Sequence, residues 1–166
     1  EMPEEEKKEI STIVGLAALK YADLSNQISK DYIFDVDKFT SFDGKTGPYI
    51  LYTLVRIKSI LNKYFENNKI NENKILVPEE DIEKQMLLKI AKYNQALEES
   101  YIENAPSKIC TYLYELANIF NSYYQKVKIL QGDEARLNSN IVLLSLMKSI
   151  FENGIDLLGF DAPERM

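Results

Sequence analysis

The sequence predicts an all-α protein built as a bundle of helices. Its 166 residues are enough for one domain with a sizeable hydrophobic core. Glycine and proline number only 6 and 5, and their combined share is about half of average usage. Apolar residues recur every three or four positions along most of the chain, which is the period of an amphipathic helix. Together these observations predict long helices joined by few turns.

The first predicted helix covers residues 4–22. Three glutamates open it, where the positive end of the helix dipole favours acidic side chains. Its apolar face is predicted to contain Ile10, Ile13, Val14, Leu16, Ala17 and Tyr21. Residues 30–47 break this pattern, because aromatic and aspartate residues alternate loosely there and end at Gly44 and Gly47. We expect an ordered loop, since flexible linkers lack aromatic anchors such as those at positions 32, 34, 39 and 42.

A second helix is predicted from Pro48, because proline suits the first turn of a helix. The side chains predicted to face the core are Ile50, Leu54, Ile57, Leu61 and Tyr64. The asparagine-rich residues 67–73 then predict a turn or an exposed loop.

Three further helices are predicted in the second half of the chain. The third begins near residue 78 and includes Leu97, and the fourth begins after Pro106 and includes Val127. Residues 131–133 form the next break. The fifth helix spans about residues 137–152, with residues 153 and 154 at or near its end. Its inward side chains are predicted to be Val142, Leu146, Ile150 and Phe151.

The composition excludes several kinds of chemistry. The chain has no histidine, so it has no imidazole base and no histidine metal ligand. Its single cysteine, Cys110, can form neither an internal disulfide nor a multi-cysteine zinc site, and is interpreted as a small apolar filler. A reducing cytoplasm fits this cysteine usage best. We therefore predict no catalytic residue and no bound metal in this chain.

The charge distribution leaves nucleic-acid binding open only as a local property. The net charge is −6, whereas a nucleic-acid-binding surface is expected to be basic. Residues 45–74 nevertheless carry six basic and two acidic residues. These cations are compatible with a local phosphate-binding face, although lysines that merely keep helices in solution are the simpler interpretation.

Two features of the sequence concern its cellular context. No run approaches the roughly 18 consecutive apolar residues that a membrane-spanning helix needs, so no membrane segment is predicted. The first residues are acidic, unlike a signal peptide, and the first residue is not methionine. We expect the chain to be part of a longer protein.

Three short motifs fail on inspection. Residues 44–46 (GKT) resemble the end of a phosphate-binding P-loop, but Phe39 occupies the position where that motif needs a glycine. Asp35 and Asp37 open like a calcium loop, but the next ligand and the glycine are missing, so a solvated or a capping pair of acidic residues is expected. The acidic residues 79–83 are better suited to the start of a helix than to a catalytic carboxylate pair.

One combination of aromatic and basic residues remains, near the end of the fourth predicted helix. Its members are Tyr112, Tyr114, Tyr123, Tyr124, Lys126 and Lys128. Exposed tyrosines beside lysines are suited to stacking on unpaired RNA bases while the lysines contact phosphates. Tyrosines at helical spacing are also typical of a core, with their hydroxyl groups at its rim. The residues alone leave both interpretations open.

Four segments of the chain resemble segments that occur together in one protein family. Residues 15–25 (GLAALKYADLS) are similar to one family segment, and residues 31–35 (DYIFD) with 42–49 (FDGKTGPY) are similar to a second. Residues 112–117 (YLYELA) resemble a third, and residues 153–166 (NGIDLLGFDAPERM) are similar to the segment with which members of the family end. On these four segments the chain resembles the arginyl-tRNA synthetase family of class I.

The resemblance implies a fold and a division of the chain. Residues 49–166 look like the DALR-type anticodon-binding helical bundle of class Ia aminoacyl-tRNA synthetases, and residues 1–48 look like the segment that joins it to a catalytic domain. The four residues that give this domain its name align with residues 145–148, where only the hydrophobicity and the final positive charge are kept.

The resemblance also implies a function. The parent protein would be an arginine–tRNA ligase, a cytoplasmic monomer that uses ATP and Mg²⁺ in its catalytic domain to attach arginine to its tRNA. This chain, without that domain or any cofactor of its own, would be inactive alone and would hold the tRNA by its anticodon.

The family places a tyrosine that matches Tyr124, and a terminal methionine that matches Met166, near the anticodon loop. Lys128 falls where some members have another aromatic residue in contact with the anticodon. Lys126, Lys128 and Arg165 are the predicted phosphate contacts. Two alternatives remain: the anticodon domain of a different class I synthetase, and a helical protein-interaction module, which fits the acidic composition.

Overall fold

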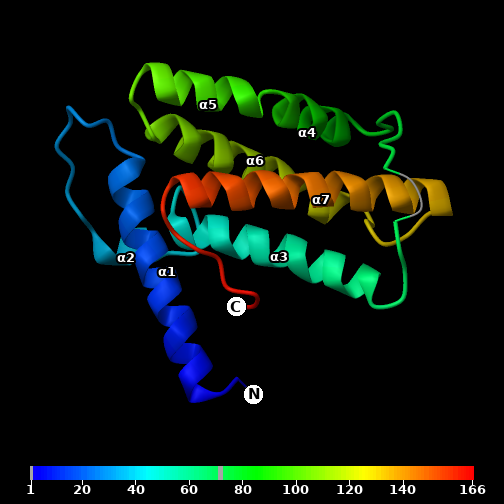
Figure 1. The fold of residues 1–166 in the computed structure, drawn as a ribbon, viewed down its shortest axis with the longest axis horizontal. Coiled ribbons are helices and arrows are strands. Elements are labelled where there is room, and N and C mark those ends of the chain that lie inside the picture. Colours follow the sequence, from blue (N-terminus) through cyan, green and yellow to red (C-terminus); the bar gives the residue numbers. More distant parts are fainter. Residues whose placement is uncertain (1, 71–72) are drawn as a thin grey trace.

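The computed structural model describes residues 2–70 and 73–166, which form seven helices and no β-strand (Figure 1). The helices are α1 (Glu4–Leu24), α2 (Val36–Phe39), α3 (Gly47–Phe65), α4 (Asp81–Ala91), α5 (Tyr93–Ile102), α6 (Ser107–Lys126) and α7 (Glu134–Leu157). The predicted all-α class is confirmed. Glu1 and part of the predicted 67–73 loop, Asn71 and Glu72, lie outside the described residues.

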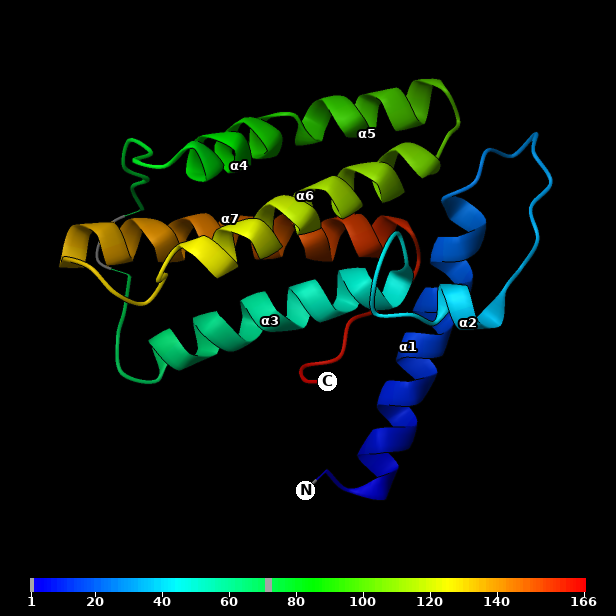
Figure 2. The same ribbon diagram turned by 180° about the vertical axis from the view of Figure 1, so that it is seen from behind.

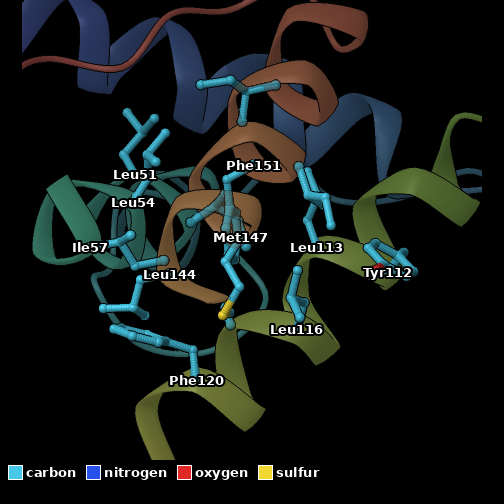
Figure 3. Packing of buried hydrophobic residues seen from close by; sticks show 14 of the residues in the cluster. Leu51, Leu54, Ile57, Tyr112, Leu113, Leu116, Phe120, Leu144, Met147 and Phe151 are labelled. Carbon is cyan, nitrogen blue, oxygen red and sulfur yellow. The ribbon is translucent and has the colours of Figure 1, made fainter. Parts of the chain in front are cut away.

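The core forms where α3, α6 and α7 pack side by side, with α4 and α5 covering the other side of α6 (Figures 1 and 2). Side chains from the three central helices point toward one another (Figure 3). The fully buried members include Leu51, Leu54, Ile57, Leu113, Leu116, Phe120, Leu144, Met147 and Phe151. All five inward residues predicted for the second helix are buried, so that prediction is confirmed.

Helix α1 crosses α3 at one end of the bundle and extends beyond it (Figure 2). The crossing is close, because a Cβ atom at Gly47 would overlap the backbone carbonyl of Ala17. Beyond the crossing, the fully buried Tyr21 donates a hydrogen bond of 2.7 Å to the carbonyl of Cys110. The second half of α1 therefore belongs to the core. Leu16, predicted to lie on the buried face, is exposed instead.

The aromatic loop includes the short helix α2, which the pattern did not predict. Phe39 at the end of α2 is buried, with Phe34 stacked on it and the edge of Tyr32 against it. Asp35 caps α2 by accepting from the backbone N–H of Lys38 at 3.1 Å, so the capping alternative holds for Asp35.

Helix α3 begins directly after the GKT motif. The Thr46 hydroxyl caps it by accepting from the backbone N–H of Tyr49 at 3.2 Å. The GKT residues therefore form a helix start, and Pro48 lies in its first turn as predicted.

The third predicted helix is wrong in its extent, because the chain breaks at Lys92 and forms α4 and α5 instead. Tyr93, directly after the break, lies 5.3 Å from the ring of Tyr112 and donates a hydrogen bond of 2.6 Å to Asn153. The residues that contact Tyr93 are distant from it in the sequence. No glycine or proline lies at the break, so the local sequence did not reveal it. The acidic residues at the start of α4 have the predicted role, since the Glu83 carboxylate accepts from the backbone N–H groups of Glu79 and Glu80.

The fourth predicted helix is confirmed as α6, except that Val127 is the extended residue after its end. The fifth is longer than predicted. Asp133 caps α7 at its start by accepting from the N–H of Arg136 at 2.8 Å. Gly154 lies inside α7, near its end. A Cβ atom at position 154 would come within 2.8 Å of the Leu113 side chain.

The end of α7 is formed by Gly159, which has a positive φ of 76°. The backbone N–H groups of Phe160 and Gly159 bond back to the carbonyls of Ile155 and Asp156, which is a Schellman motif. The predicted inward face is partly wrong. Leu146 is exposed and Val142 only half-buried, whereas Ile150 and Phe151 are buried as predicted.

The segment after α7 runs back along α3 (Figure 1). Phe160 and Pro163 are buried, and Arg165 and Met166 are exposed beside α3. Lys20 on α1 donates to the carbonyl of Gly159. In the described part of the chain, no helix combines the length and apolar character needed to cross a membrane.

Candidate nucleic-acid interface

Tyr124 lies near the end of α6 with 44% of its surface exposed. The ring of Phe120, one turn earlier, lies 6.1 Å away, and the guanidinium carbon of Arg56 on α3 lies 4.8 Å from the ring centre. The neighbouring Tyr123 is fully buried. Helix α6 therefore presents one of these two adjacent tyrosines to solvent and places the other in the core.

Arg56 lies between two tyrosine rings. Its guanidinium carbon is 4.5 Å from the ring centre of Tyr52 and 4.8 Å from that of Tyr124. We call these three residues the Arg56 stack. Phe42 from the aromatic loop contacts Tyr52 edge-on at 6.3 Å and is itself exposed, so it extends the same surface.

A polar network between α3 and α6 fixes the Arg56 guanidinium. It donates to the Asn121 side-chain oxygen at 2.8 Å and to the Tyr52 hydroxyl at 2.6 Å. The Asn121 amide group donates in turn to the hydroxyls of Tyr49 and Thr53. Because both nitrogen and oxygen of the Asn121 amide are engaged, its orientation and that of Arg56 are set before any ligand binds.

The Arg56 stack has the chemistry of a single-stranded nucleic-acid contact. Exposed aromatic rings stack on unpaired bases, and a guanidinium both stacks on a π-system and donates to phosphate or base-edge oxygens. Both tyrosine rings already contact the cation before a base binds, which reduces the conformational entropy lost on binding.

Met166 borders an open groove of about 670 Å³ beside α3. The groove is lined by Glu6, Val55, Ser59, Asn62, Lys63, Glu66, Glu164, Arg165 and Met166. Arg165 donates to both carboxylate oxygens of Glu6 on α1. This hydrogen-bonded pair lowers the pKa of Glu6 and raises the pKa of Arg165. Arg165 therefore already has an anionic partner in this structure.

Lys126 and Lys128 are exposed where the chain leaves α6. They line a groove of about 330 Å³ that also includes Arg136 and the acidic residues at the start of α4. In the described residues neither lysine forms an ion pair, whereas Arg136 pairs with Glu79 and Glu83. Both ammonium groups are thus available to an added anion.

The structure brings the predicted residues to neighbouring places without joining them in one pocket. Tyr124 reaches α3 at Arg56, and Met166 reaches α3 at the groove that contains Val55 and Ser59. Because residues three or four positions apart share a helix face, the Met166 groove adjoins the Arg56 stack on the exposed surface of α3. Lys126 and Lys128 follow Tyr124 within four positions in the sequence.

Of the four tyrosines singled out in the sequence, Tyr112 and Tyr123 are core residues and Tyr114 is half-buried. Burial raises the pKa of Tyr112 and Tyr123. The core interpretation therefore holds for these two, and only Tyr124 is well placed to stack.

Sequence reasoning missed Tyr52, Arg56 and Asn121. One signal was present, because an aromatic and an arginine four positions apart lie on the same face of a helix. The pairing with Asn121 and Tyr124 joins residues 65 or more positions apart, and no local pattern contains it. In the part of the chain that the structure describes, no cluster of three or more cysteine and acidic side chains is arranged to hold a metal ion.

Comparisons with known proteins identify relatives of the chain. Residues 50–166 match the family described as the DALR anticodon binding domain. The chain is 50% identical over 162 residues to a protein of Alkaliphilus oremlandii named arginine–tRNA ligase, and 53% identical over 167 residues to one of the same name from Agathobacter rectalis. These alignments cover 97% and 98% of this chain but 28% of each relative.

Solved structures agree in fold. The arginyl-tRNA synthetase of Thermus thermophilus matches over 100% of this chain and 28% of its own, with a TM-score of 0.88 at 28% identity. That of Plasmodium falciparum matches over 95% of this chain and 28% of its own, with a TM-score of 0.81 at 27% identity. The chain thus spans a little over a quarter of the length of these proteins.

Proposed function

Because the chain belongs to the family of DALR anticodon-binding domains, we propose that it binds the anticodon loop of the tRNA that carries arginine. The observation that carries this proposal is the Arg56 stack. It presents a solvent-exposed tyrosine, fixed in place by a hydrogen-bonded guanidinium, at the junction of two core helices. Anticodon bases are unpaired and are suited to stacking on such a surface.

We assign base contacts to Tyr124 and Met166. The Tyr124 ring offers a flat surface, and a flexible methionine packs adaptably against a base. Their exposure at neighbouring places beside α3 supports the assignment, since an anticodon loop splays several bases.

We assign phosphate contacts to Lys126, Lys128 and Arg165. The two lysines have no ionic partner among the described residues, which suits this role. Arg165 must exchange the Glu6 carboxylate for a phosphate, so its net contribution to binding is smaller than that of the lysines.

The parent activity is proposed from the relatives. Proteins named arginine–tRNA ligase share 50% or more identity with this chain over a little over a quarter of their length. We propose that this chain acts within such an ATP-dependent ligase, as a monomer in the cytoplasm. ATP, Mg²⁺ and the catalytic groups would belong to the rest of that polypeptide, so this chain alone is expected not to activate arginine.

The division of labour within the chain is also a proposal. Residues 49–166 would form the anticodon-binding bundle, and residues 1–48 would connect it to the catalytic domain. The family match from residue 50 onward supports this boundary. The packing of Tyr21 on Cys110 means that the connecting segment also contributes to the core of the bundle.

The test is a titration of the chain with fluorescent anticodon stem-loops at two salt concentrations. One RNA carries the arginine anticodon and the other has its central anticodon base changed. We expect tighter binding to the arginine RNA and, for Tyr124→Ala, a loss of about tenfold in affinity, as for one stacked base. Tyr101→Ala is the matched control, because Tyr101 is 84% exposed on α5 and contacts no part of the proposed site.

The outcomes separate the alternatives. Preference for a different anticodon would assign the chain to another class I synthetase. The absence of salt-dependent RNA binding would instead support a protein-interaction module. Equal and weak binding to both RNAs, unaffected by Tyr124→Ala, would overturn the assignment of Tyr124.

A further inference from the structure

Lys58 is a buried lysine on α3 that the proposed base and phosphate contacts do not use. Only 6% of the residue is exposed, so its ammonium group requires a nearby negative charge. Its Nζ atom lies 2.6 Å from a carboxylate oxygen of Glu164 and 3.8 Å from one of Glu152 on α7. The first contact is a hydrogen-bonded ion pair.

The ion pair is unequal in its burial. The Glu164 side chain is 80% exposed, and Lys58 reaches it from beneath. Lys58 lowers the pKa of Glu164, chiefly through the hydrogen bond between them. Glu164 therefore remains charged and attached to α3 throughout the neutral range, and its removal would leave Lys58 without its nearest counter-charge.

The ion pair between Lys58 and Glu164 also attaches the final residues of the chain to α3. Phe160 and Pro163 anchor the start of the final segment in the core, whereas residues 164–166 lie on the surface of α3. Glu164 is two residues before Met166, and both border the groove beside Val55 and Ser59. The other polar attachment near this end joins Arg165 to Glu6 on α1, not to α3.

We propose that Lys58 is a positioning residue for RNA binding: through Glu164 it holds Met166 against α3, in the groove next to the Arg56 stack. This inference rests on the proposed function, since it assumes that Met166 contacts a base. Lys58 itself touches no RNA. It determines where on α3 the methionine lies, and thereby the distance between the Met166 and Tyr124 contacts.

The first measurement needs no RNA. The chain contains four methionines, so ¹³C-methyl labelling gives four signals, of which Met166 is identified by its loss in Met166→Ala. Lys58→Met keeps an unbranched side chain of similar length and leaves Glu164 exposed to water. Its new methionine adds a fifth signal, which is recognised because it is absent from the unaltered chain and from Glu164→Gln. We expect Lys58→Met and Glu164→Gln each to shift and narrow the Met166 signal toward that of a mobile side chain. The signals of Met86 and Met147, buried in the core, should not move.

The second measurement is affinity for the arginine anticodon stem-loop. We expect Lys58→Met to weaken binding about fivefold, the scale of losing one well-packed contact. In combination with Met166→Ala the further loss should be close to zero, because both changes remove the same contact. Lys89→Met is the matched control. It removes a lysine paired with Glu115 between α4 and α6, and affinity should be unchanged.

The outcomes distinguish this inference from the proposed function. If Met166→Ala weakens RNA binding while Lys58→Met neither shifts the Met166 signal nor weakens binding, the positioning role is overturned and the proposed function stands. If losses from the two changes add fully, Lys58 acts elsewhere and the inference is also overturned. If the unaltered chain binds no RNA, both fail, whatever the Met166 signal shows. Thermal unfolding of each variant confirms that affinity is compared between folded chains.

Discussion

Arg56 joins the two helices that form the proposed RNA surface. Its guanidinium packs between the rings of Tyr52 and Tyr124 and donates to Asn121. A planar, delocalised cation suits this place, because it stacks on both rings while its edge donates hydrogen bonds. The ammonium group of a lysine would keep the positive charge but has no planar surface to stack on the rings.

Arg56→Lys therefore separates stacking from charge. We expect affinity for the arginine stem-loop to fall about fivefold, because the Tyr124 ring loses the surface that orients it. The dependence of affinity on salt should be unchanged, since the charge is retained. Fluorescence titration at several salt concentrations measures both. A wild-type affinity in this variant would show that the guanidinium does not orient Tyr124.

At the scale of elements, the crossing of α1 and α3 determines how the segment before the bundle is attached. Gly47 lies at the point of closest approach, against the backbone of Ala17. The contacting atoms belong to the backbone and cannot turn aside as a flexible side chain does. The absence of a side chain at position 47 is therefore a condition for this crossing.

Gly47→Ala should destabilise the chain by about 3 kcal/mol, because the added methyl group forces the two helices apart. Gly15→Ala is the matched control on α1, where an added Cβ atom meets nothing within 4 Å. There we expect stabilisation of about 0.5–1 kcal/mol, from the better helix propensity of alanine. Urea unfolding monitored by circular dichroism measures both free energies. Equal changes in the two variants would contradict the close crossing.

At the scale of the whole molecule, the proposed RNA binding by a chain of net charge −6 depends on a few local cations. Lys126 and Lys128 are without ionic partners in the described residues, whereas Arg165 is paired with Glu6 and Lys58 with Glu164. Cations that are already paired release few counterions when they meet a phosphate. The salt dependence of binding should therefore be shallow and should come from the two lysines.

The expected slope of log affinity against log salt concentration is about −1.4, since each phosphate contact of a single-stranded region contributes about −0.7. Lys126→Ala should reduce the slope to about −0.7. Lys92→Ala, which removes an exposed lysine between α4 and α5, should leave it unchanged. Titrations over a range of salt concentrations measure the slopes. A steep slope that Lys126→Ala does not alter would place the phosphate contacts elsewhere on the chain.

The sequence by itself determined the all-α class and where most of the long helices begin, because helix-start signals and apolar periodicity are local properties. The starts at Glu4, Gly47 and Ser107 and the role of the acidic residues at the start of α4 follow from neighbours within a few positions. The resemblance of four segments also gave the family, which the match over residues 50–166 confirms.

The tertiary structure alone decided how these helices break, face one another and form a surface. The break at Lys92, the burial of Met147 rather than Leu146, and the passage of α7 through Gly154 depend on contacts with distant helices. The contact of Arg56 with Tyr124 and the pairing of Arg165 with Glu6 join residues that are far apart in the sequence. Periodicity specifies that a helix has a buried face, but only the packed partner selects which residues lie on it and which side chains meet across it.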